Sequence, residues 1–505
     1  MNKLLSSNLF VGVDFGTQSV RVGIIDEKGK LVSSAEEGYT ISFPRVGWAE
    51  QNPNDWYKAF ISSWEKAIQK LPLLQRKTIK AFCICATSST VFPVNSDGVP
   101  LSDALLWMDS RAVEQAEIIN ASNHPILSHC GGEVSVEWLI PKVLWFKQKD
   151  RALYEEAFRF IEQLDWINWK LSGRWVSSIC NAACKANYVA QGVGWDSEFF
   201  RIIGLDDYED KIVTEVIPVG GLIGYLKREF CEMYGLNRSV SLYQGGIDAY
   251  IAVLGLGVVQ EGILGTILGT SFVELCLSKK PLEIEGIWGP YRDVIINGYY
   301  ALEGGQISAG SIAKWFKDML SNRGSMNFMK ISYEAKESGV GAHNLIALDF
   351  FQGNRTPFKN PRARGALWGL NLSHSRGDIY RALLESVALG TRNIISNFNS
   401  FGYRFDKWVA CGGVTKDKLW MSIISDSCGI PISLLNSSSY AGLMGCAIIS
   451  AVSSGMFKNY DIAASAMLRE VASIEPEKRN HERYDEIYGK YLELCHIMNT
   501  MTQGK

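Results

Sequence analysis

The sequence lacks several features that mark whole classes of protein. Its charges nearly cancel, because it has 51 basic and 53 acidic side chains, which gives a formal net charge of −2. No overall positive field attracts nucleic acid or an anionic membrane, so we expect neither as a partner. The longest apolar run, from Ala249 to Val259, is shorter than the ~20 residues that a membrane-spanning helix needs. We interpret this run as a buried segment.

Signatures of metal sites and disulfides are also scarce. Only six histidines occur, and none has a partner at HxH or HxxxH spacing, which disfavours a metal site built from histidines. The cysteines form no CxxC pair and their number is odd, as is typical of reduced thiols. Asp14 interrupts the N-terminal apolar residues before they reach the length of a signal sequence. We therefore expect a cytoplasmic protein.

Strand and helix patterns alternate along the first part of the chain. Apolar runs predict strands, and apolar residues at every fourth position predict amphipathic helices. We expect strands at 9–13, 20–25, 31–34 and 79–86, and helices at 112–119, 140–147 and across Trp56, Phe60, Trp64 and Ile68. This alternation predicts an α/β fold.

The length and an internal echo indicate two domains. A chain of 505 residues exceeds the roughly 100–200 residues of a typical domain. The segment VDFGTQSVRVGII around Gly16 is echoed by TILGTSFVELCLS around Gly269, almost half the chain away. Such an echo also arises by chance in ordinary hairpins. We predict one domain at 1–253 and a second at 254–505.

Each echo contains a Gly-Thr turn between two strands. Such a turn presents backbone N–H groups and a hydroxyl to one point, and glycine lets an anion approach closely. Gly16–Thr17 and Gly269–Thr270 could therefore grip a polyphosphate from both sides. Asp14 could hold Mg²⁺, which prefers oxygen ligands, and Arg21 could balance phosphate charge. The alternative is a plain hairpin whose aspartate caps the turn.

Three further glycine clusters are candidates for binding. Gly412–Gly413 follows a strand-like segment and precedes a helical one, so a base or ribose could lie against this backbone. Tight packing explains the same pair equally well. Glu303 begins a run of small residues that ends at Gly310 and opens a helix. Asp248 follows a glycine pair, where an aspartate is usually a cap or turn residue.

In combination these segments resemble the FGGY carbohydrate kinase family of the actin-like ATPase superfamily, and most closely its ribulokinase and D-ribulose (pentulose) kinase branch. The resemblance covers nearly the whole chain, and its motifs occur in order: DFGTQSVR, GWAEQNPNDWY, LLWMDSRA, EWLIPKVLWFK, GGIDAYIAVLG, LGTS, YYALEGGQISAGSIAKWF, RGALWGLNLSHSRGDIYRALLES and CGGVTKDKLW. It implies two actin-like (ribonuclease H-like) ATPase domains with an interdomain cleft. The first would bind the sugar and the second the nucleotide.

The resemblance also assigns roles to residues in matching motifs. It implies that Asp248 is the catalytic base and that Asp14 is the acid near Mg²⁺. It places the phosphates and the nucleotide at Gly16, Thr17, Arg21, Gly269, Thr270, Gly310, Gly412 and Gly413. It places the sugar at Thr87, Ser88, Glu137, Lys185, Asp248 and Glu303. Carboxylates and a lysine suit the hydroxyl and keto oxygens of a polyol, although Glu137 and Lys185 could instead be a surface pair.

The implied activity is ATP-dependent phosphorylation of a ketopentose or pentitol. Met108 to Arg111 follow Trp107 where many L-ribulose enzymes carry histidines, which favours conversion of D-ribulose to D-ribulose 5-phosphate. Cys411, Val414 and Tyr440 depart from the family pattern near the nucleotide.

Other readings stay open from the sequence. L-ribulose, ribitol, D-xylulose and glycerol are alternative acceptors. A non-catalytic nucleotide-dependent switch and a sugar-binding regulator are alternatives of other classes. The expected partner is a small sugar or polyol, and a homodimer is left open.

Overall fold

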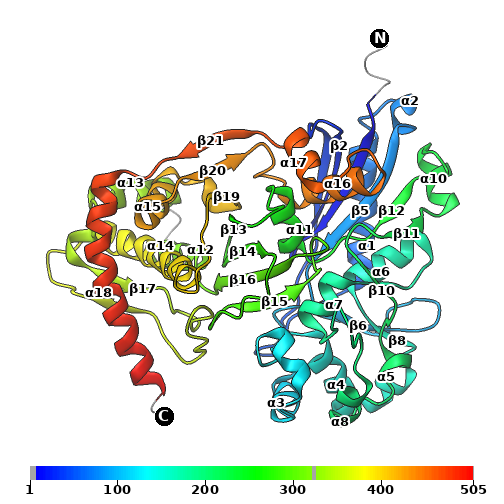
Figure 1. Ribbon diagram of the computed structural model, residues 1–505, viewed down its shortest axis with the longest axis horizontal. Helices are drawn as coiled ribbons and strands as arrows, with labels where there is room; N and C mark the ends of the chain where they lie inside the picture. The colour runs from blue at the N-terminus through cyan, green and yellow to red at the C-terminus, as the bar shows by residue number, and fades with distance from the viewer. Residues whose placement is uncertain (1–6, 321–325, 504–505) are drawn as a thin grey trace.

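The computed structural model describes residues 7–320 and 326–503 and has two lobes (Figure 1). One lobe contains most of the first half of the chain, and the other contains most of the second half. In the described part of the chain, no helix is both long and apolar enough to cross a membrane.

The first lobe is built on a six-stranded sheet in the order β11-β12-β5-β1-β2-β3. Its central strands β1, β5 and β12 are parallel, and β1, β2 and β3 form an antiparallel meander. The strands are β1 (Leu9–Phe15), β2 (Ser19–Asp26), β3 (Leu31–Gly38), β5 (Ile79–Ala86), β11 (Leu222–Tyr225) and β12 (Ser241–Tyr243). The four strands predicted from the sequence are confirmed.

The second lobe repeats this arrangement in a seven-stranded sheet in the order β15-β16-β14-β13-β19-β20-β21. Here β13, β14 and β16 form the antiparallel meander, and β13, β19 and β20 are parallel. The strands are β13 (Ile263–Leu268), β14 (Phe272–Ser278), β15 (Trp288–Arg292), β16 (Tyr300–Gln306), β19 (Lys407–Cys411), β20 (Ile432–Leu435) and β21 (Glu470–Ile474). The weak sequence echo therefore corresponds to a repeated topology.

Helix α1 (Pro53–Ile68) illustrates how local sequence sets an element. The side chain of Asn52 caps the helix by accepting from the backbone N–H of Asn54, and Pro53 occupies a position where no N–H is needed. Trp56, Phe60 and Trp64 are fully buried, because helix α1 packs on β2 and β3. The helix predicted from the apolar spacing is confirmed.

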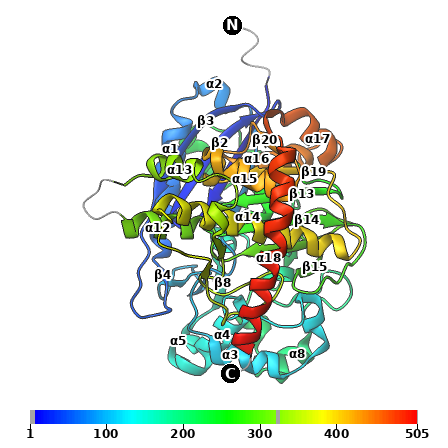
Figure 2. The same cartoon turned by 90° about the vertical axis from the view of Figure 1, so that its left-hand side faces the viewer.

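The remaining elements surround the two sheets (Figure 2). The helices are α2 (Leu73–Arg76), α3 (Val113–Ala121), α4 (Leu139–Lys149), α5 (Arg151–Glu156), α6 (Gln163–Ser172), α7 (Ile179–Lys185), α8 (Ser197–Ile202), α9 (Tyr208–Lys211), α10 (Arg228–Tyr234), α11 (Asp248–Gly255), α12 (Gly310–Leu320), α13 (Phe328–Glu337), α14 (Arg376–Ser400), α15 (Lys418–Cys428), α16 (Ala441–Ser453), α17 (Tyr460–Met467) and α18 (Lys478–Gln503). The short strands are β4 (Glu50–Gln51), β6 (Val91–Val94), β7 (Ala104–Leu105), β8 (Arg159–Glu162), β9 (Ser177–Ser178), β10 (Val216–Ile217), β17 (Ile346–Leu348) and β18 (Ala366–Trp368). Short 3-10 helices are at Pro125–Cys130, Ala342–Asn344 and Gly413–Lys416.

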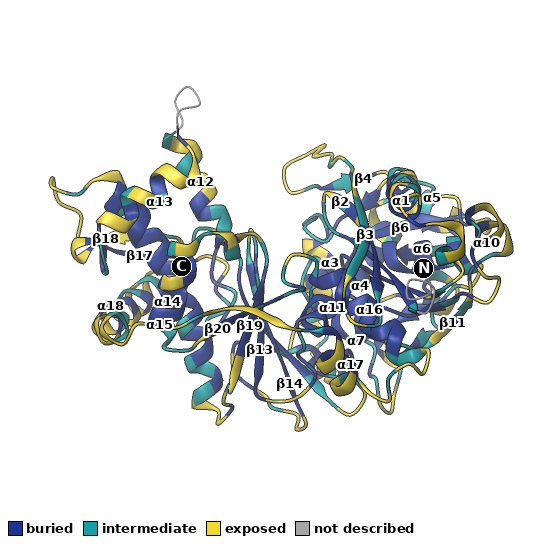
Figure 3. Cartoon of the chain, turned by 90° about the horizontal axis from the view of Figure 1, so that it is seen from above, coloured by how far each residue is buried: buried dark blue, intermediate teal, exposed yellow. Residues whose placement is uncertain are grey.

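Helices α11 and α16 join the lobes. Although α16 belongs to the second half of the chain, it packs on β1 of the first sheet and on α11. Glycines allow this close approach: a Cβ on Gly445 would lie 1.9 Å from the carbonyl oxygen of Ile251. Both helices are buried (Figure 3). The predicted domain boundary at residue 253 lies within α11, and the division at that residue stays a prediction.

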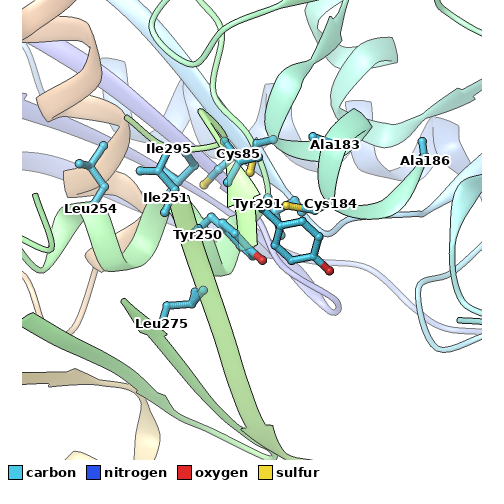
Figure 4. Close-up of a cluster of buried hydrophobic side chains, with 14 of the residues drawn as sticks. Cys85, Ala183, Cys184, Ala186, Tyr250, Ile251, Leu254, Leu275, Tyr291 and Ile295 are labelled. Carbon is cyan, nitrogen blue, oxygen red and sulfur yellow. The ribbon is translucent and has the colours of Figure 1, made fainter. Parts of the chain in front are cut away.

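A shared hydrophobic core continues across this junction. Figure 4 shows Ile251 and Leu254 of α11 near Leu275 of β14 and Tyr291 of β15, and all belong to one cluster of buried residues. All eleven cysteines are free thiols, and all except the partly exposed Cys428 are buried. Helix α11, which begins at Asp248, is therefore fixed by both lobes.

Candidate active site

The first Gly-Thr turn, residues 16–18, is held by side chains from distant parts of the chain. The Tyr39 hydroxyl contacts the carbonyl of Gly16. The side-chain amide of Gln51 donates to the carbonyl of Thr17 at 2.8 Å, and the indole N–H of Trp107 donates to the Thr17 hydroxyl at 3.0 Å. Sequence reasoning missed these supporting roles, although Gln51 and Trp107 lie in two of the quoted family segments.

The second Gly-Thr turn, residues 269–271, is held by backbone instead. The N–H groups of Gly310 and Ser311, which begin α12, donate to the carbonyls of Gly269 and Thr270 at 3.1 and 3.0 Å. A Cβ on Gly310 would lie 2.3 Å from the Gly269 carbonyl oxygen, so only glycine fits there. The structure thus brings together the predicted residues Gly269, Thr270 and Gly310.

A cavity of about 210 Å³ opens beside this second turn. It is lined by Thr270, Gly310, Ser311, Lys314, Trp315 and Asp318. Lys314 provides a positive charge one helical turn after Gly310, although it pairs with Asp318 at 2.5 Å. Sequence reasoning missed Lys314. The available signal was its position four residues after Gly310, which places both residues on the same face of a helix.

Asp14 lies near the end of β1, just before the first Gly-Thr turn. Burial, and then the negative charge of Asp248, raise the pKa of Asp14 to about 7, while Arg21 opposes this rise. The Cys85 thiol donates to the Asp14 carboxylate at 3.5 Å. Gly442 of α16 is so close that a Cβ there would lie 2.6 Å from a carboxylate oxygen of Asp14. Sequence reasoning missed Gly442, because only tertiary packing brings α16 to β1.

The other residues predicted for the nucleotide lie in different settings. Arg21 on β2 forms an ion pair with Glu36 at 3.3 Å, and both side chains are about half exposed. Gly412 has a φ of 104°, and a Cβ there would lie 2.4 Å from the Leu268 carbonyl oxygen. Close packing of β19 on β13 therefore requires this glycine. A Cβ on Gly413 would meet nothing within 4 Å, which leaves its face open.

Asp248 begins α11 directly after the turn that follows β12. A Cβ on Gly245 would lie 1.9 Å from the Ile84 carbonyl oxygen, so the absence of a side chain at Gly245 lets this turn approach β5. The N–H of Ala86 donates to the Gly246 carbonyl at 3.2 Å, which fixes that approach. Burial raises the pKa of Asp248 to about 6, although the Ala249 N–H, donating at 2.7 Å, stabilises the carboxylate.

The residues predicted for the sugar begin at the end of β5. We call residues 87–90 the β5 turn. The N–H of Thr87 donates to the Phe15 carbonyl at 3.1 Å, and its hydroxyl donates to Gln163 at 3.2 Å. Thr87 is buried, whereas Ser88 and Glu137 are partly exposed. Ser88 and Glu137 are therefore more accessible to a ligand than Thr87.

Lys185 and Glu303 meet from opposite halves of the chain. Lys185 ends α7, and its Nζ lies 3.5 Å from the carboxylate of Glu303 on β16. Tyr250 of α11 donates to the same carboxylate at 2.7 Å, and Arg355 lies 3.8 Å away. Burial opposes ionisation of Glu303, but Lys185 and Arg355 outweigh it and hold its pKa below the ordinary value. The alternative of a Glu137–Lys185 surface pair is wrong.

The carboxylates near the first turn fit Mg²⁺ only in combination with phosphates. Within residues 7–320 and 326–503, no three His, Cys, Asp or Glu side chains converge on a point that could hold a metal. Mg²⁺ does not require three protein ligands, because it keeps several water ligands and binds one or two carboxylates together with substrate phosphates. Asp14, buried near the end of β1, supplies one such carboxylate.

The chain is similar to known proteins of one family over most of its length. The models of the FGGY family of carbohydrate kinases match the chain, the N-terminal domain at residues 9–255 and the C-terminal domain at 264–454. A human "FGGY carbohydrate kinase domain-containing protein" is 30% identical, over 96% of each chain. A ribulokinase of Anoxybacillus flavithermus is 29% identical, over 96% of this chain and 93% of its own length.

Solved structures show the same fold at lower identity. A gluconate kinase from Lactobacillus acidophilus superposes with a TM-score of 0.88 at 20% identity, covering 99% of both chains. A Plasmodium falciparum glycerol kinase with ADP gives 0.83 at 20% identity, covering 96% of this chain and 98% of that one. The predicted two-domain actin-like α/β fold is confirmed. The chain therefore belongs to the FGGY family of carbohydrate kinases, and it is a phosphotransferase.

Proposed function

We propose that the protein transfers the γ-phosphoryl group of ATP to a ketopentose or pentitol, with D-ribulose as acceptor and D-ribulose 5-phosphate as product. The observation that carries the proposal is the ionised Glu303 paired with Lys185. Tyr250, which donates to Glu303, lies two residues after Asp248 on α11. Through Tyr250, hydrogen-bond acceptors and a donor for a polyol therefore lie beside α11, the helix that begins with the proposed base. A nucleotide-dependent switch would have no need of them.

Asp248 is the general base in this proposal. Its carboxylate accepts the proton of the terminal sugar hydroxyl while that oxygen bonds to the γ-phosphorus, and the bond from phosphorus to the leaving oxygen of ADP breaks. A raised pKa of about 6 keeps the carboxylate ionised near neutral pH and makes it a better proton acceptor. Phosphoryl transfer depends mainly on positioning and charge, so one carboxylate suffices.

The two Gly-Thr turns hold the phosphates in this proposal. Gly16, Thr17, Gly269 and Thr270 present their N–H groups and hydroxyls, and the cavity beside Gly310 accepts the nucleotide. Asp14 would hold Mg²⁺, which neutralises charge on the phosphates. Arg21, Gly412 and Gly413 complete the predicted nucleotide side.

The sugar side of the proposal consists of Thr87, Ser88, Glu137, Lys185 and Glu303. The relatives named as ribulokinases support a pentulose, and the sequence after Trp107 favours the D-ribulose branch. A cytoplasmic location and a homodimer stay predictions.

A substrate panel tests the proposal. Release of ADP is coupled to a spectroscopic readout with D-ribulose, L-ribulose, ribitol, D-xylulose and glycerol. We expect the highest kcat/KM with D-ribulose, and NMR should show its 5-phosphate. ATP hydrolysis that no sugar changes would favour the switch, and failure to bind MgATP would favour the regulator.

Glu303→Gln sharpens the assignment of the sugar side. The amide keeps the shape of the side chain but removes the charge that Lys185 and Arg355 face. We expect the KM for the sugar to rise about tenfold, because a buried charge pair loses one partner. The KM for ATP should stay within about twofold, and an equal rise in both KM values would contradict the assignment.

A further inference from the structure

Lys142 is a buried lysine that none of the roles above uses. It lies on α4 with no exposed surface, and lysines are almost never fully buried unless they are paired. Its Nζ donates to two backbone carbonyls, those of Ser89 and Leu106, at 2.6 Å each. Both hydrogen bonds are short, and they join segments that are separate in the sequence.

The first of these carbonyls belongs to the β5 turn. Ser89 has a φ of 53°, a left-handed conformation that is uncommon outside glycine and costs free energy. Its N–H donates to the Glu162 carboxylate at 2.7 Å. The residue is therefore held from both sides, by Glu162 at its N–H and by Lys142 at its carbonyl. This restraint maintains a turn that the chain would not adopt by itself.

The second carbonyl leads to the first Gly-Thr turn. Leu106 precedes Trp107, whose indole N–H donates to the Thr17 hydroxyl at 3.0 Å. Lys142 thus contacts one segment that carries Thr87 and Ser88 and another that touches Thr17. A displacement of α4 would be transmitted to both turns.

We propose that Lys142 is a positioning residue that fixes the β5 turn relative to the first Gly-Thr turn, and hence the acceptor hydroxyl relative to the γ-phosphate. The inference rests on the proposed function, because it assigns the sugar to one turn and phosphate to the other. It requires hydrogen-bond donors and no permanent charge. An ammonium and a neutral amine both provide donors for two carbonyls.

The surroundings of Lys142 agree with a donor role. Burial lowers its pKa to about 7, although the carboxylates of Asp109, Glu137 and Glu162 oppose this shift. Since either protonation state satisfies both carbonyls, the link persists across neutral pH.

Lys142→Met tests the link, with Lys147→Met as the matched control. Methionine keeps an unbranched side chain but removes both donors, whereas Lys147 is on the same helix and pairs with Asp207 away from the site. We expect kcat/KM for the sugar to fall about 100-fold in Lys142→Met, with a fall in kcat as well as a rise in KM, because a misplacement near 1 Å has such an effect. The Lys147→Met enzyme should keep wild-type values.

Hydrogen exchange separates failure of this inference from failure of the proposed function. In folded Lys142→Met without substrates, amide exchange should rise at least about tenfold in residues 87–90 and 104–107, and in 15–18, but not in the second Gly-Thr turn. This readout needs no sugar. Unchanged exchange at these residues, or wild-type sugar kinetics in the folded variant, would overturn the inference.

Two further variants keep the test decisive if Lys142→Met does not fold. Trp107→Phe removes the indole N–H that donates to Thr17 and keeps the Leu106 carbonyl that Lys142 binds, so it should raise the KM for ATP more than that for the sugar. Ser89→Gly removes the cost of the left-handed φ and keeps both backbone hydrogen bonds, so the KM for the sugar should stay within about twofold of the wild-type value. An equal rise of both KM values in Trp107→Phe, no rise in either, or a rise in the KM for the sugar above about twofold in Ser89→Gly would overturn the inference.

Discussion

The two Gly-Thr turns occupy equivalent places in two sheets of the same topology, yet they are held in different ways. Tyr39, Gln51 and Trp107 hold the first turn through side chains. The second turn is held by the backbone at the start of α12. The turns also differ in charge, because Asp14 stands two residues before Gly16 and Ile267 stands two residues before Gly269.

Under the proposed function, this difference corresponds to different roles for the two turns. The first turn has an acid and adjustable side-chain supports, as suits a site that holds Mg²⁺ and meets the acceptor. The second turn has neither, and its close backbone packing suits rigid docking of the nucleotide. The comparison predicts that backbone changes damage the second turn and that side-chain changes damage the first.

Gly310→Ala should have the largest effect. Its Cβ would lie 2.3 Å from the Gly269 carbonyl oxygen, so the second turn must move. We expect unfolding to become easier by about 1–3 kcal/mol and affinity for a non-hydrolysable ATP analogue to fall about 100-fold. Urea unfolding and calorimetric titration measure the two effects.

Gly16→Ala is the matched control for the first turn. Its Cβ would lie 3.6 Å from the Ser19 carbonyl oxygen, an ordinary contact, so stability should change by less than about 0.5 kcal/mol. If both alanine variants were equally destabilised, the two turns would not differ in how closely their backbone is packed.

Gln51→Leu should affect the first turn through a side chain. It leaves the Thr17 carbonyl and the Trp56 indole N–H without their partner, which costs about 1–3 kcal/mol. We expect the KM for ATP to rise about tenfold and the KM for the sugar to change little. Steady-state kinetics measure both KM values, and Lys58→Met, at an exposed position, is the control. An unaltered KM for ATP would show that the hydrogen bond from Gln51 to Thr17 does not position the first turn for ATP.

Asp14→Asn should reveal the charge that only the first turn carries. Burial raises the pKa of Asp14 to about 7, so this group stabilises the ligand-free fold below its unfolded pKa and loses that contribution as pH rises through about 7. At about pH 8 the variant should therefore be more stable than the wild type by about 1–2 kcal/mol. At about pH 4 the two should be equal.

Urea unfolding at both pH values measures this difference. Asp97→Asn, at an exposed position, is the control and should show no gain at either pH. An Asp14→Asn gain that is the same at both pH values would contradict the assignment to the Asp14 charge.

Local sequence predicted the strands and helices well, because their signals are contained in a few neighbouring residues. The run 79–86 is apolar except for the exposed Lys80 and forms β5, and Asn52 and Pro53 begin α1 as expected. The two-domain α/β fold also followed from ordered motifs. For these features tertiary packing agrees with local preference.

The rest depends on contacts between distant residues. Nothing around Gly442 indicates that α16 returns to β1, and nothing around Lys142 indicates which carbonyls it meets. The pairing of Lys185 with Glu303 likewise arises from the meeting of α7 and β16. Spacing within one segment carries no information on such contacts.

The most direct test of the account is the turnover of Asp248→Asn with D-ribulose and MgATP. The amide keeps the size of the side chain but cannot accept the proton of the attacking hydroxyl as a carboxylate does. We expect kcat to fall at least about 100-fold, while affinities for D-ribulose and the ATP analogue change less than about threefold. A folded variant with near-wild-type turnover would contradict the account.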